Sequence, residues 1–254
     1  MHFLARTWTL IAAAGLLVLP AAHGADGGVS NRPPASSLSS IVVGFTGGFV
    51  RHDNMRHGPV QLAQRLRQNS PPGTYVRVFE NRHRRDAYKT ILSLLDRNHD
   101  GRLSNEEKEQ ARIVLFGHSW GAAAVVMLAR ELERDGIPVL LTVQVDSVAK
   151  FWQQDRIIPQ NVAEAVNFYQ PHGLIHGRQV IRAADDSKTQ ILGNYRYDYR
   201  QTPAECGKMA WADRTFTPSH MQSECDPKLW SRVELLVRQT IAKDAGVADS
   251  IEKP

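Results

Sequence analysis

Residues 113–134 read Ile-Val-Leu-Phe-Gly-His-Ser-Trp-Gly-Ala-Ala-Ala-Val-Val-Met-Leu-Ala-Arg-Glu-Leu-Glu-Arg, and the rest of the chain is best interpreted outward from them. The apolar run Ile113–Phe116 predicts a buried strand, and residues 122–134 predict a helix that is apolar around much of its circumference. Between them Gly117-His118-Ser119-Trp120-Gly121 is a G-x-S-x-G pentapeptide. A strand, a tight glycine-flanked turn and a helix form the setting of a nucleophile elbow. Ser119 is therefore the candidate nucleophile, and an ordinary tight turn is the alternative.

Strand-like and helix-like segments alternate along the rest of the chain. The strand-like runs are 41–45, 74–79, 113–116, 139–145 and 166–169, with two more short candidates within 178–199. The helix-like runs are 59–67, 87–95, 122–134 and 229–242. Because such alternation is typical of parallel sheets covered by helices, the pattern predicts an α/β fold, a mainly parallel sheet with helices on both faces. No internal repeat is visible, so residues 40–254 are predicted to be a single domain.

The first 24 residues have the parts of a secretory signal peptide. Arg6 supplies positive charge, residues 10–19 are an unbroken apolar run, and Ala22-His23-Gly24 has the small-x-small form of a cleavage site. The apolar run is shorter than the roughly 20 residues that cross a bilayer, and no later stretch is long enough. We therefore expect a secreted or periplasmic protein. Residues 25–39, rich in Gly, Ser and Pro, are expected to be a flexible lead-in.

Composition and charge argue against a nucleic-acid partner. The 254 residues are 42% hydrophobic and 22% charged, an ordinary globular composition. The net charge of +5 is small and spread along the chain, and aromatic residues make up only 7%. Nucleic-acid-binding proteins usually concentrate basic residues in a stripe and add stacking aromatics.

The two cysteines, Cys206 and Cys225, are predicted to form a disulfide. Exported proteins meet oxidising conditions, in which a pair is more often bonded than free. Closing a loop over the 18 residues between them would stabilise the fold by about 3 kcal/mol. Two separately buried thiols are the alternative.

A second motif is independent of the pentapeptide. Residues 96–107 match the calcium loop D-x-[DN]-x-[DN]-G-x₅-E at every defined position, with Gly101 at the sharp turn. The expected oxygen ligands, with the Arg102 carbonyl among them, are Asp96, Asn98, Asp100, Arg102, Ser104 and Glu107. The segment after this EF-hand-like loop is short and polar, and the chain has no second loop. We therefore expect structural Ca²⁺ and not a calcium sensor, with a solvated polar turn as the alternative.

The elbow and the order of the elements resemble the α/β-hydrolase family, of lipase and esterase type, from about Ile41 to Ala242. The resemblance implies a serine hydrolase that cleaves small or lipid esters. It also implies an oxyanion hole made by two backbone N–H groups. One belongs to Trp120, the residue after the nucleophile, and the other to Gly48 or Phe49 in the turn after the first strand. Thr46 stands where a histidine is expected in lipases.

The resemblance further implies that an acid and a histidine follow the serine in chain order. Asp146 ends the strand 139–145, so its carboxylate would emerge at the same sheet edge as Ser119. The next strand, at which the family more usually carries its acid, offers no carboxylate. Asp185 and Asp186 are the alternatives to Asp146.

Three histidines follow Asp146, and His220 is the preferred base. It is predicted to lie in a polar loop before the last helix, where the family carries its catalytic histidine, and between the two cysteines. His172 and His176 are the alternatives. Taken together, Ser119, Asp146 and His220 would form a catalytic triad, and the sequence therefore predicts an esterase. A non-catalytic calcium-binding protein on a hydrolase scaffold, and an amidase or thioesterase with the same triad, are the competing interpretations.

Overall fold

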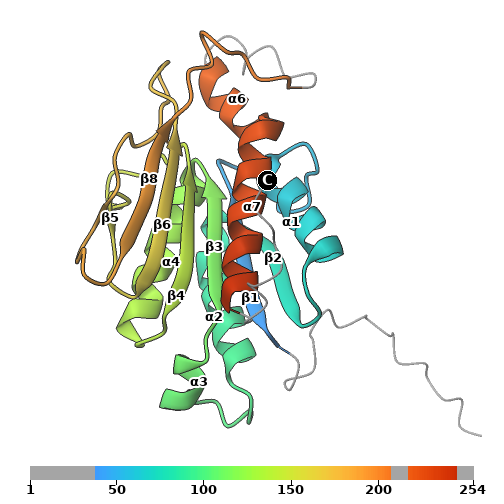
Figure 1. The fold of residues 1–254 in the computed structure, drawn as a ribbon, viewed down its shortest axis with the longest axis vertical. Coiled ribbons are helices and arrows are strands. Elements are labelled where there is room, and N and C mark those ends of the chain that lie inside the picture. Colours follow the sequence, from blue (N-terminus) through green and yellow to red (C-terminus); the bar gives the residue numbers. More distant parts are fainter. Residues whose placement is uncertain (1–37, 207–216, 245–254) are drawn as a thin grey trace, which may run out of the picture. The chain divides into compact units, whose positions relative to one another are not determined.

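A computed structural model describes residues 38–206 and 217–244 (Figure 1). The predicted signal peptide and residues 25–37 of the predicted lead-in lie outside the described residues. The described part contains a six-stranded sheet in the order β2-β1-β3-β4-β6-β8, and all neighbouring strands are parallel. Its strands are β1 (Ser40–Thr46), β2 (Thr74–Glu80), β3 (Ile113–His118), β4 (Val139–Val145), β6 (Val162–Tyr169) and β8 (Gln190–Arg196).

The order of the strands places a crevice at one edge of the sheet. The chain passes from β1 to β2 on one side and then returns to β3 on the other side of β1. From there it moves outward through β4, β6 and β8. The loops that leave β1 and β3 therefore run in opposite directions at the carboxyl ends of these strands. Ligands of open α/β sheets bind in the crevice at such a switch point.

Helices cover both faces of the sheet because alternate strand residues point to opposite sides. Val42 joins a core with α1 (Gly58–Asn69) and α7 (Pro227–Asp244). Its neighbours Ile41 and Val43 join a core with α2 (Arg84–Leu95) and α4 (Trp120–Arg134). In Figure 1, α1 and α7 are drawn in front of the sheet and α4 behind it. The predicted α/β class, with a mainly parallel sheet in a single domain, is confirmed.

Several short elements were not predicted from periodicity. They are the 3-10 helix η2 (Asn81–His83), α3 (Asn105–Glu109), β5 (Ile157–Ile158) and α6 (Pro218–Cys225). Strand β5 forms a two-stranded parallel sheet with β7 (Arg182–Ala183), and β7 and β8 are the two short strands predicted within 178–199. The prediction that His220 lies in a loop was wrong, because His220 is in α6. This helix has no apolar stripe that periodicity could detect. Pro218 begins it, and proline is well suited to the first helical turn.

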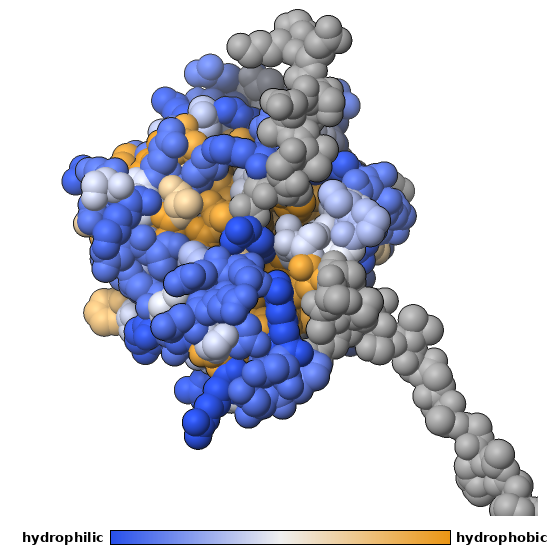
Figure 2. Space-filling view, turned by 60° about the horizontal axis from the view of Figure 1, so that its bottom comes forward, coloured by the Kyte–Doolittle hydropathy of each residue, from blue (hydrophilic) through white to orange (hydrophobic). Residues whose placement is uncertain are grey.

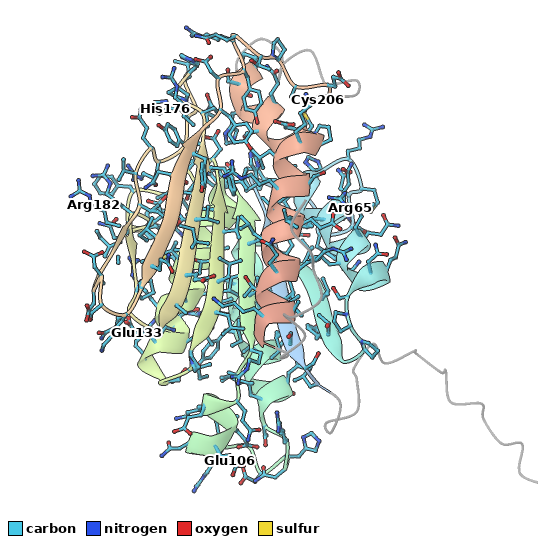
Figure 3. All side chains as sticks on the ribbon, in the orientation of Figure 1. Arg65, Glu106, Glu133, His176, Arg182 and Cys206 are labelled. Carbon is cyan, nitrogen blue, oxygen red and sulfur yellow. A yellow bond between two sulfur atoms is a disulfide. The ribbon has the colours of Figure 1, made fainter. Side chains whose placement is uncertain are left out.

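The predicted disulfide between Cys206 and Cys225 is present, with the two Cα atoms 5.5 Å apart. Cys225 is the last residue of α6, so the bond ties the end of this helix to the segment that follows β8. Cys206 lies at the end of the molecule that carries α6 (Figure 3). The two cysteines are 19 positions apart in the sequence, and in the chain-entropy model a cross-link over this length stabilises the fold by about 3 kcal/mol.

The opposite end of the molecule carries α3 and the segment before it (Figure 1). When this end is turned forward, most of the surface in view is hydrophilic (Figure 2). No helix among residues 38–206 and 217–244 is long and apolar enough to cross a membrane.

Candidate active site

Ser119 has an unusual backbone conformation at the junction of β3 and α4. Its φ of 55° and ψ of −124° lie in a region that residues with a side chain seldom adopt. The conformation is held from both sides, because the Ser119 N–H donates to the Val145 carbonyl at 3.0 Å and its carbonyl accepts from Ala122 at 3.0 Å. Such strain persists only where the surrounding structure enforces it, and it is concentrated at functional sites.

The two glycines of the pentapeptide allow the elbow to pack closely. A Cβ atom on Gly121 would lie 2.4 Å from the Phe45 carbonyl oxygen, on the central strand β1. A Cβ atom on Gly117 would lie 2.5 Å from the Gly121 carbonyl oxygen. Larger residues at either position would push α4 away from the sheet and displace Ser119.

The structure brings Ser119, His220 and Asp146 together from three distant parts of the chain. The His220 Nε2 atom lies 2.9 Å from Ser119 Oγ, and its Nδ1 atom lies 2.7 Å from Asp146 Oδ2. All three residues are buried, and Asp146 has no exposed surface. In a neutral imidazole one ring nitrogen donates and the other accepts. With Asp146 accepting from Nδ1–H, Nε2 is left to accept the Ser119 proton.

Three donors orient the Asp146 carboxylate toward His220. Its Oδ1 accepts from the backbone N–H groups of Gly177 at 2.7 Å and Gln170 at 3.2 Å. Its Oδ2 accepts from the Gln170 side chain at 2.9 Å, and the Ser223 hydroxyl donates to the His220 carbonyl oxygen at 2.7 Å. A Cβ atom on Gly177 would lie 2.3 Å from Oδ1, so only glycine permits this approach.

Gln170 and Gly177 are residues of the candidate site that sequence reasoning did not identify. Gln170 directly follows β6, and its position at the carboxyl end of a strand was a usable signal. Gly177 carried no signal, because its role depends on a contact with a residue 31 positions earlier.

The alternative acids and bases have other partners. The Asp185 carboxylate accepts from the N–H and Oγ of Ser187 at 2.9 and 2.6 Å within one turn, and Asp186 is exposed. His172 Nε2 lies 3.1 Å from Asp198 Oδ1. His176 is exposed, with Nδ1 3.2 Å from the Gly173 carbonyl oxygen.

The residues predicted for the oxyanion hole lie next to the elbow. Trp120 is the first residue of α4, where helical N–H groups have no partner within the helix. A Cβ atom on Gly47 would lie 2.9 Å from Ser119 Cβ, so the turn after β1 packs directly against the serine. Gly48 in this turn has a positive φ of 47°. The neighbouring Phe49 ring packs edge-on against the Trp120 ring, with the two ring centroids 5.7 Å apart.

Asn81, just after β2, holds this turn in place. Its side-chain amide donates to the carbonyl oxygens of Gly48 at 2.6 Å and Thr46 at 3.3 Å. Sequence reasoning did not identify Asn81, although it too follows the carboxyl end of a strand. A buried amide that fixes a turn keeps the N–H groups of that turn aimed in one direction.

A buried carboxylate, Glu224, lies beside the triad between two histidines. Its Oε1 atom lies 2.7 Å from His57 Nδ1 and 3.5 Å from His118 Nδ1. Burial raises the pKa of Glu224, but the attraction of His118 and His57 outweighs it and holds the pKa well below its usual range. The centroid of the His118 ring lies 4.7 Å from that of the His220 ring. The cluster of His57, His118 and Glu224 therefore packs against the histidine of the triad. Nothing in the sequence pattern predicts this cluster.

Replacing Glu224 with glutamine is expected to lower the free energy of unfolding by about 3 kcal/mol at pH 7, because it breaks a buried charge pair. The pKa of Glu224 is lower in the folded protein than in the unfolded chain, where a glutamate has a pKa of about 4.3. The Glu224 carboxylate therefore stabilises the fold fully only when the pH is above that unfolded-state pKa. The contribution is lost as the pH falls through the folded-state pKa. Urea unfolding from pH 7 to pH 3 should therefore show the wild type approaching the variant only below about pH 4.

Glu234→Gln is the matched control, because Glu234 of α7 pairs with Arg65 of α1 and with Arg238, and these side chains are partly exposed. Partly exposed pairs contribute at most about 1 kcal/mol. Equal losses in the two variants, or a Glu224→Gln loss that is independent of pH, would contradict a stabilising role of this carboxylate.

Comparisons with known proteins yield structural similarity without sequence similarity. No protein-family model and no curated protein matches the chain. A dienelactone hydrolase-like promiscuous phosphotriesterase from metagenomic libraries is 14% identical with a TM-score of 0.43, over 82% of this chain and 87% of that one. A dienelactone hydrolase from Anabaena variabilis is 13% identical with a TM-score of 0.39, over 81% and 87% of the chains. An acetylxylan esterase is 10% identical with a TM-score of 0.40, over 80% and 99%.

Proposed function

We propose that the protein is a serine hydrolase that cleaves carboxylic esters. The observation that carries the proposal is the position of His220, whose ring lies within 3 Å of both Ser119 Oγ and Asp146 Oδ2. A nucleophile within hydrogen-bond reach of a base, itself oriented by a third group, is the signature of covalent catalysis. The strained backbone of Ser119 and the three donors to Asp146 support the same role, since they hold both groups in position.

In the first half of the reaction, His220 Nε2 removes the Ser119 proton as Oγ attacks the ester carbonyl carbon. The carbonyl oxygen becomes an oxyanion, which the N–H of Trp120 and an N–H of the Gly48–Phe49 turn would stabilise. Asp146 stabilises the imidazolium that forms. When the intermediate collapses, the bond from carbon to the alcohol oxygen breaks, and the alcohol leaves with the proton from Nε2.

In the second half, water replaces the alcohol. His220 Nε2 removes a proton from water, whose oxygen attacks the acyl carbon bound to Ser119 Oγ. Collapse of this second intermediate releases the carboxylic acid and returns the proton to Ser119. Every proton transfer passes through the same ring nitrogen, so no further acid or base is required.

Exposed apolar residues around the site favour an ester with a hydrophobic part. Within the described residues, seven large hydrophobic side chains are exposed on the segments that follow β1, β4 and β6: Phe49, Met55, Phe151, Trp152, Leu174, Ile175 and Val180. Phe151 and Trp152 have relative exposures of 103% and 78%. Apolar surface of this kind gathers at binding sites. It suits small hydrophobic esters and lipids, whereas the triad alone would also serve an amide or thioester.

The geometry weighs against a non-catalytic protein on a hydrolase scaffold. A scaffold that had lost catalysis would have no reason to keep the strain at Ser119, which costs of order 1–3 kcal/mol. The disulfide between Cys206 and Cys225 supports a secreted or periplasmic location, because such bonds persist in oxidising compartments.

We also propose that the loop of residues 96–107 binds calcium as a structural ion. Gly101 has a φ of 79° at the turn, and its N–H donates to Asp96 Oδ2 at 3.1 Å, which gives the loop a compact bend. The other oxygen of Asp96, Oδ1, is buried without a hydrogen-bond partner. An orphaned carboxylate oxygen among other oxygen donors fits a hard cation.

The Glu107 carboxylate is occupied within the loop, where it accepts from the backbone N–H groups of Arg97 at 2.8 Å and Ser104 at 2.9 Å. Across the described residues, no three acidic, histidine or cysteine side chains converge as a metal-binding group. Binding would therefore require the loop carboxylates to turn inward. The ion would be held by the six residues expected from the sequence, and no step of the reaction depends on it.

Removing calcium is expected to lower the melting temperature without altering the triad. An ion that binds only the folded state raises the free energy of unfolding by about 2.7 kcal/mol when its concentration is a hundred times its dissociation constant. Calorimetry of the protein in calcium and in EDTA measures this difference. Glu107→Gln should reproduce the EDTA result, whereas Glu109→Gln, an exposed neighbour outside the motif, should not. Identical melting curves, with no heat of calcium binding, would show that the loop is a solvated turn.

A further inference from the structure

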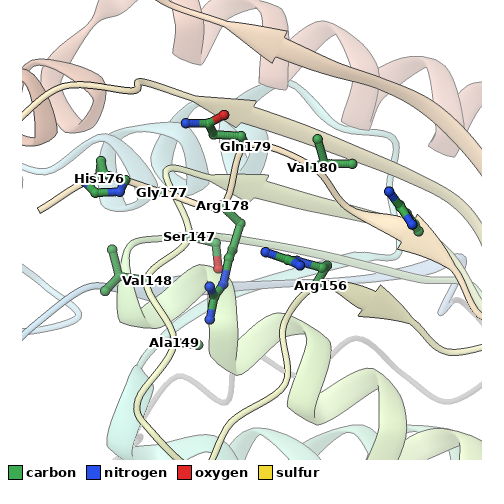
Figure 4. A pocket seen from close by; sticks show the side chains of 10 residues that line it. Ser147, Val148, Ala149, Arg156, His176, Gly177, Arg178, Gln179 and Val180 are labelled. Carbon is green, nitrogen blue, oxygen red and sulfur yellow. The ribbon is translucent and has the colours of Figure 1, made fainter.

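A cavity of about 510 Å³ lies between the segment after β4 and the segment before β7 (Figure 4). Its walls include Ser147, Gly177 and three arginines, Arg156, Arg178 and Arg182. The volume is within the range of pockets that bind small molecules. Ser119, Asp146 and His220 do not line the cavity, but Gly177, which donates to Asp146, does.

Two contacts connect this cavity to the triad. Gly177 in its wall donates to Asp146 Oδ1 at 2.7 Å, and Ser147 directly follows Asp146 in the chain. Val148, also in the wall, donates its N–H to the Ser119 carbonyl at 3.3 Å. The cavity therefore borders the residues that hold the serine and the acid.

The positive charge in the cavity is only partly neutralised. Arg178 Nε donates to Asp155 Oδ1 at 2.8 Å, and Asp155 is fully buried. Among the described residues, neither Arg156 nor Arg182 has an acidic partner, although their backbones are joined by a hydrogen bond of 2.9 Å. Both residues are exposed at the wall of the same cavity, so two positive charges without an acidic partner face it. An anion bound in the cavity would be attracted by both charges.

We propose that the cavity binds an acidic group of the substrate, so that the preferred ester carries a second, negatively charged group such as a carboxylate or phosphate. This inference rests on the proposed function, because it concerns the same substrate. Guanidinium groups present paired donors that match the two oxygens of such an anion. Val148 and Val180 in the wall would contact the hydrocarbon that joins the anion to the ester.

The test compares matched pairs of esters that differ only in the acidic group. On the acyl side, p-nitrophenyl hydrogen adipate is compared with p-nitrophenyl hexanoate. On the alcohol side, 4-acetoxyphenylacetate is compared with 4-methylphenyl acetate. In at least one pair, the acidic ester should have a kcat/KM that is about ten- to a hundredfold higher, as expected for charged hydrogen bonds. The preference should fall at high salt.

The double variant Arg156→Gln with Arg182→Gln should lose this preference, so that the two esters of the pair react with similar kcat/KM. Arg85→Gln is the matched control, because Arg85 is an exposed arginine on α2, away from the cavity, and should keep the full preference. The inference is overturned if neither pair shows a preference for the acidic ester, or if the preference survives in the double variant.

A binding measurement separates this inference from the proposed function. Adipate is titrated by calorimetry into the wild-type protein and into the double variant. If no ester of either kind is hydrolysed, the proposed function fails, and this titration decides the role of the cavity. Adipate binding that disappears in the double variant supports an acid-binding site, whereas no heat in the wild type overturns it.

Discussion

Replacing Ser119 with alanine is expected to abolish ester hydrolysis, with kcat reduced by roughly 10⁴–10⁶-fold. Ser119 Oγ is the proposed nucleophile, which His220 Nε2 contacts at 2.9 Å, and alanine leaves nothing that could form the acyl intermediate. A fluorophosphonate, which forms a bond to activated serines, should label the wild type at this residue alone. Kinetics with p-nitrophenyl esters and mass spectrometry of the labelled protein measure both effects.

Ser187→Ala is the control for this experiment, because Ser187 is an exposed serine whose contacts are with Asp185 in a turn. It should keep wild-type kcat and leave the label on Ser119. Full activity in Ser119→Ala, or a label on another serine, would discard the mechanism proposed above.

Replacing Asp146 with asparagine is expected to lower kcat by about 10³–10⁴-fold while KM changes little. The carboxylate accepts from His220 Nδ1 at 2.7 Å, and this contact keeps the proton off Nε2. Asparagine can present its amide to Nδ1 instead, which would place the proton on Nε2 and stop it from activating Ser119. Because Asp146 is fully buried, circular dichroism and melting curves must accompany the kinetics to show that the variant is folded.

Asp185→Asn is the matched control, since its carboxylate serves only the local turn with Ser187. It should retain most of the activity. If Asp185→Asn were inactive and Asp146→Asn nearly normal, the acid of the triad would lie after β7 and the hydrogen bonds around Asp146 would be purely structural.

The local pattern of the sequence was enough to predict most of the sheet and its helices. Strand β4 was predicted over its observed bounds, 139–145, and β3 and α4 were predicted to within two residues at each end. These segments are long, apolar and strongly periodic, so their propensity and their burial favour the same structure. Helix α6 was missed because its eight residues have no apolar stripe, and contacts with the rest of the fold stabilise it.

The sequence by itself also determined the chemical types available to the site. The elbow depends on residues adjacent in the chain, so Gly117 to Gly121 could be recognised without a structure. The preference for Asp146 came from its place directly after a strand, because parallel strands bring their carboxyl ends to one edge. The disulfide between Cys206 and Cys225 followed from there being no other cysteine with which to pair.

Only the tertiary structure decided which of these residues meet. His220 lies 101 positions from Ser119 and 74 from Asp146, and the sequence favoured it over His172 and His176 only through its resemblance to a known family. The donors from Gln170 and Gly177, the Asn81 amide behind the oxyanion turn and the Glu224 cluster are likewise contacts between distant segments. The physical reason is that a side chain's partner depends on the packing of whole elements, whereas periodicity records only which face of an element is buried.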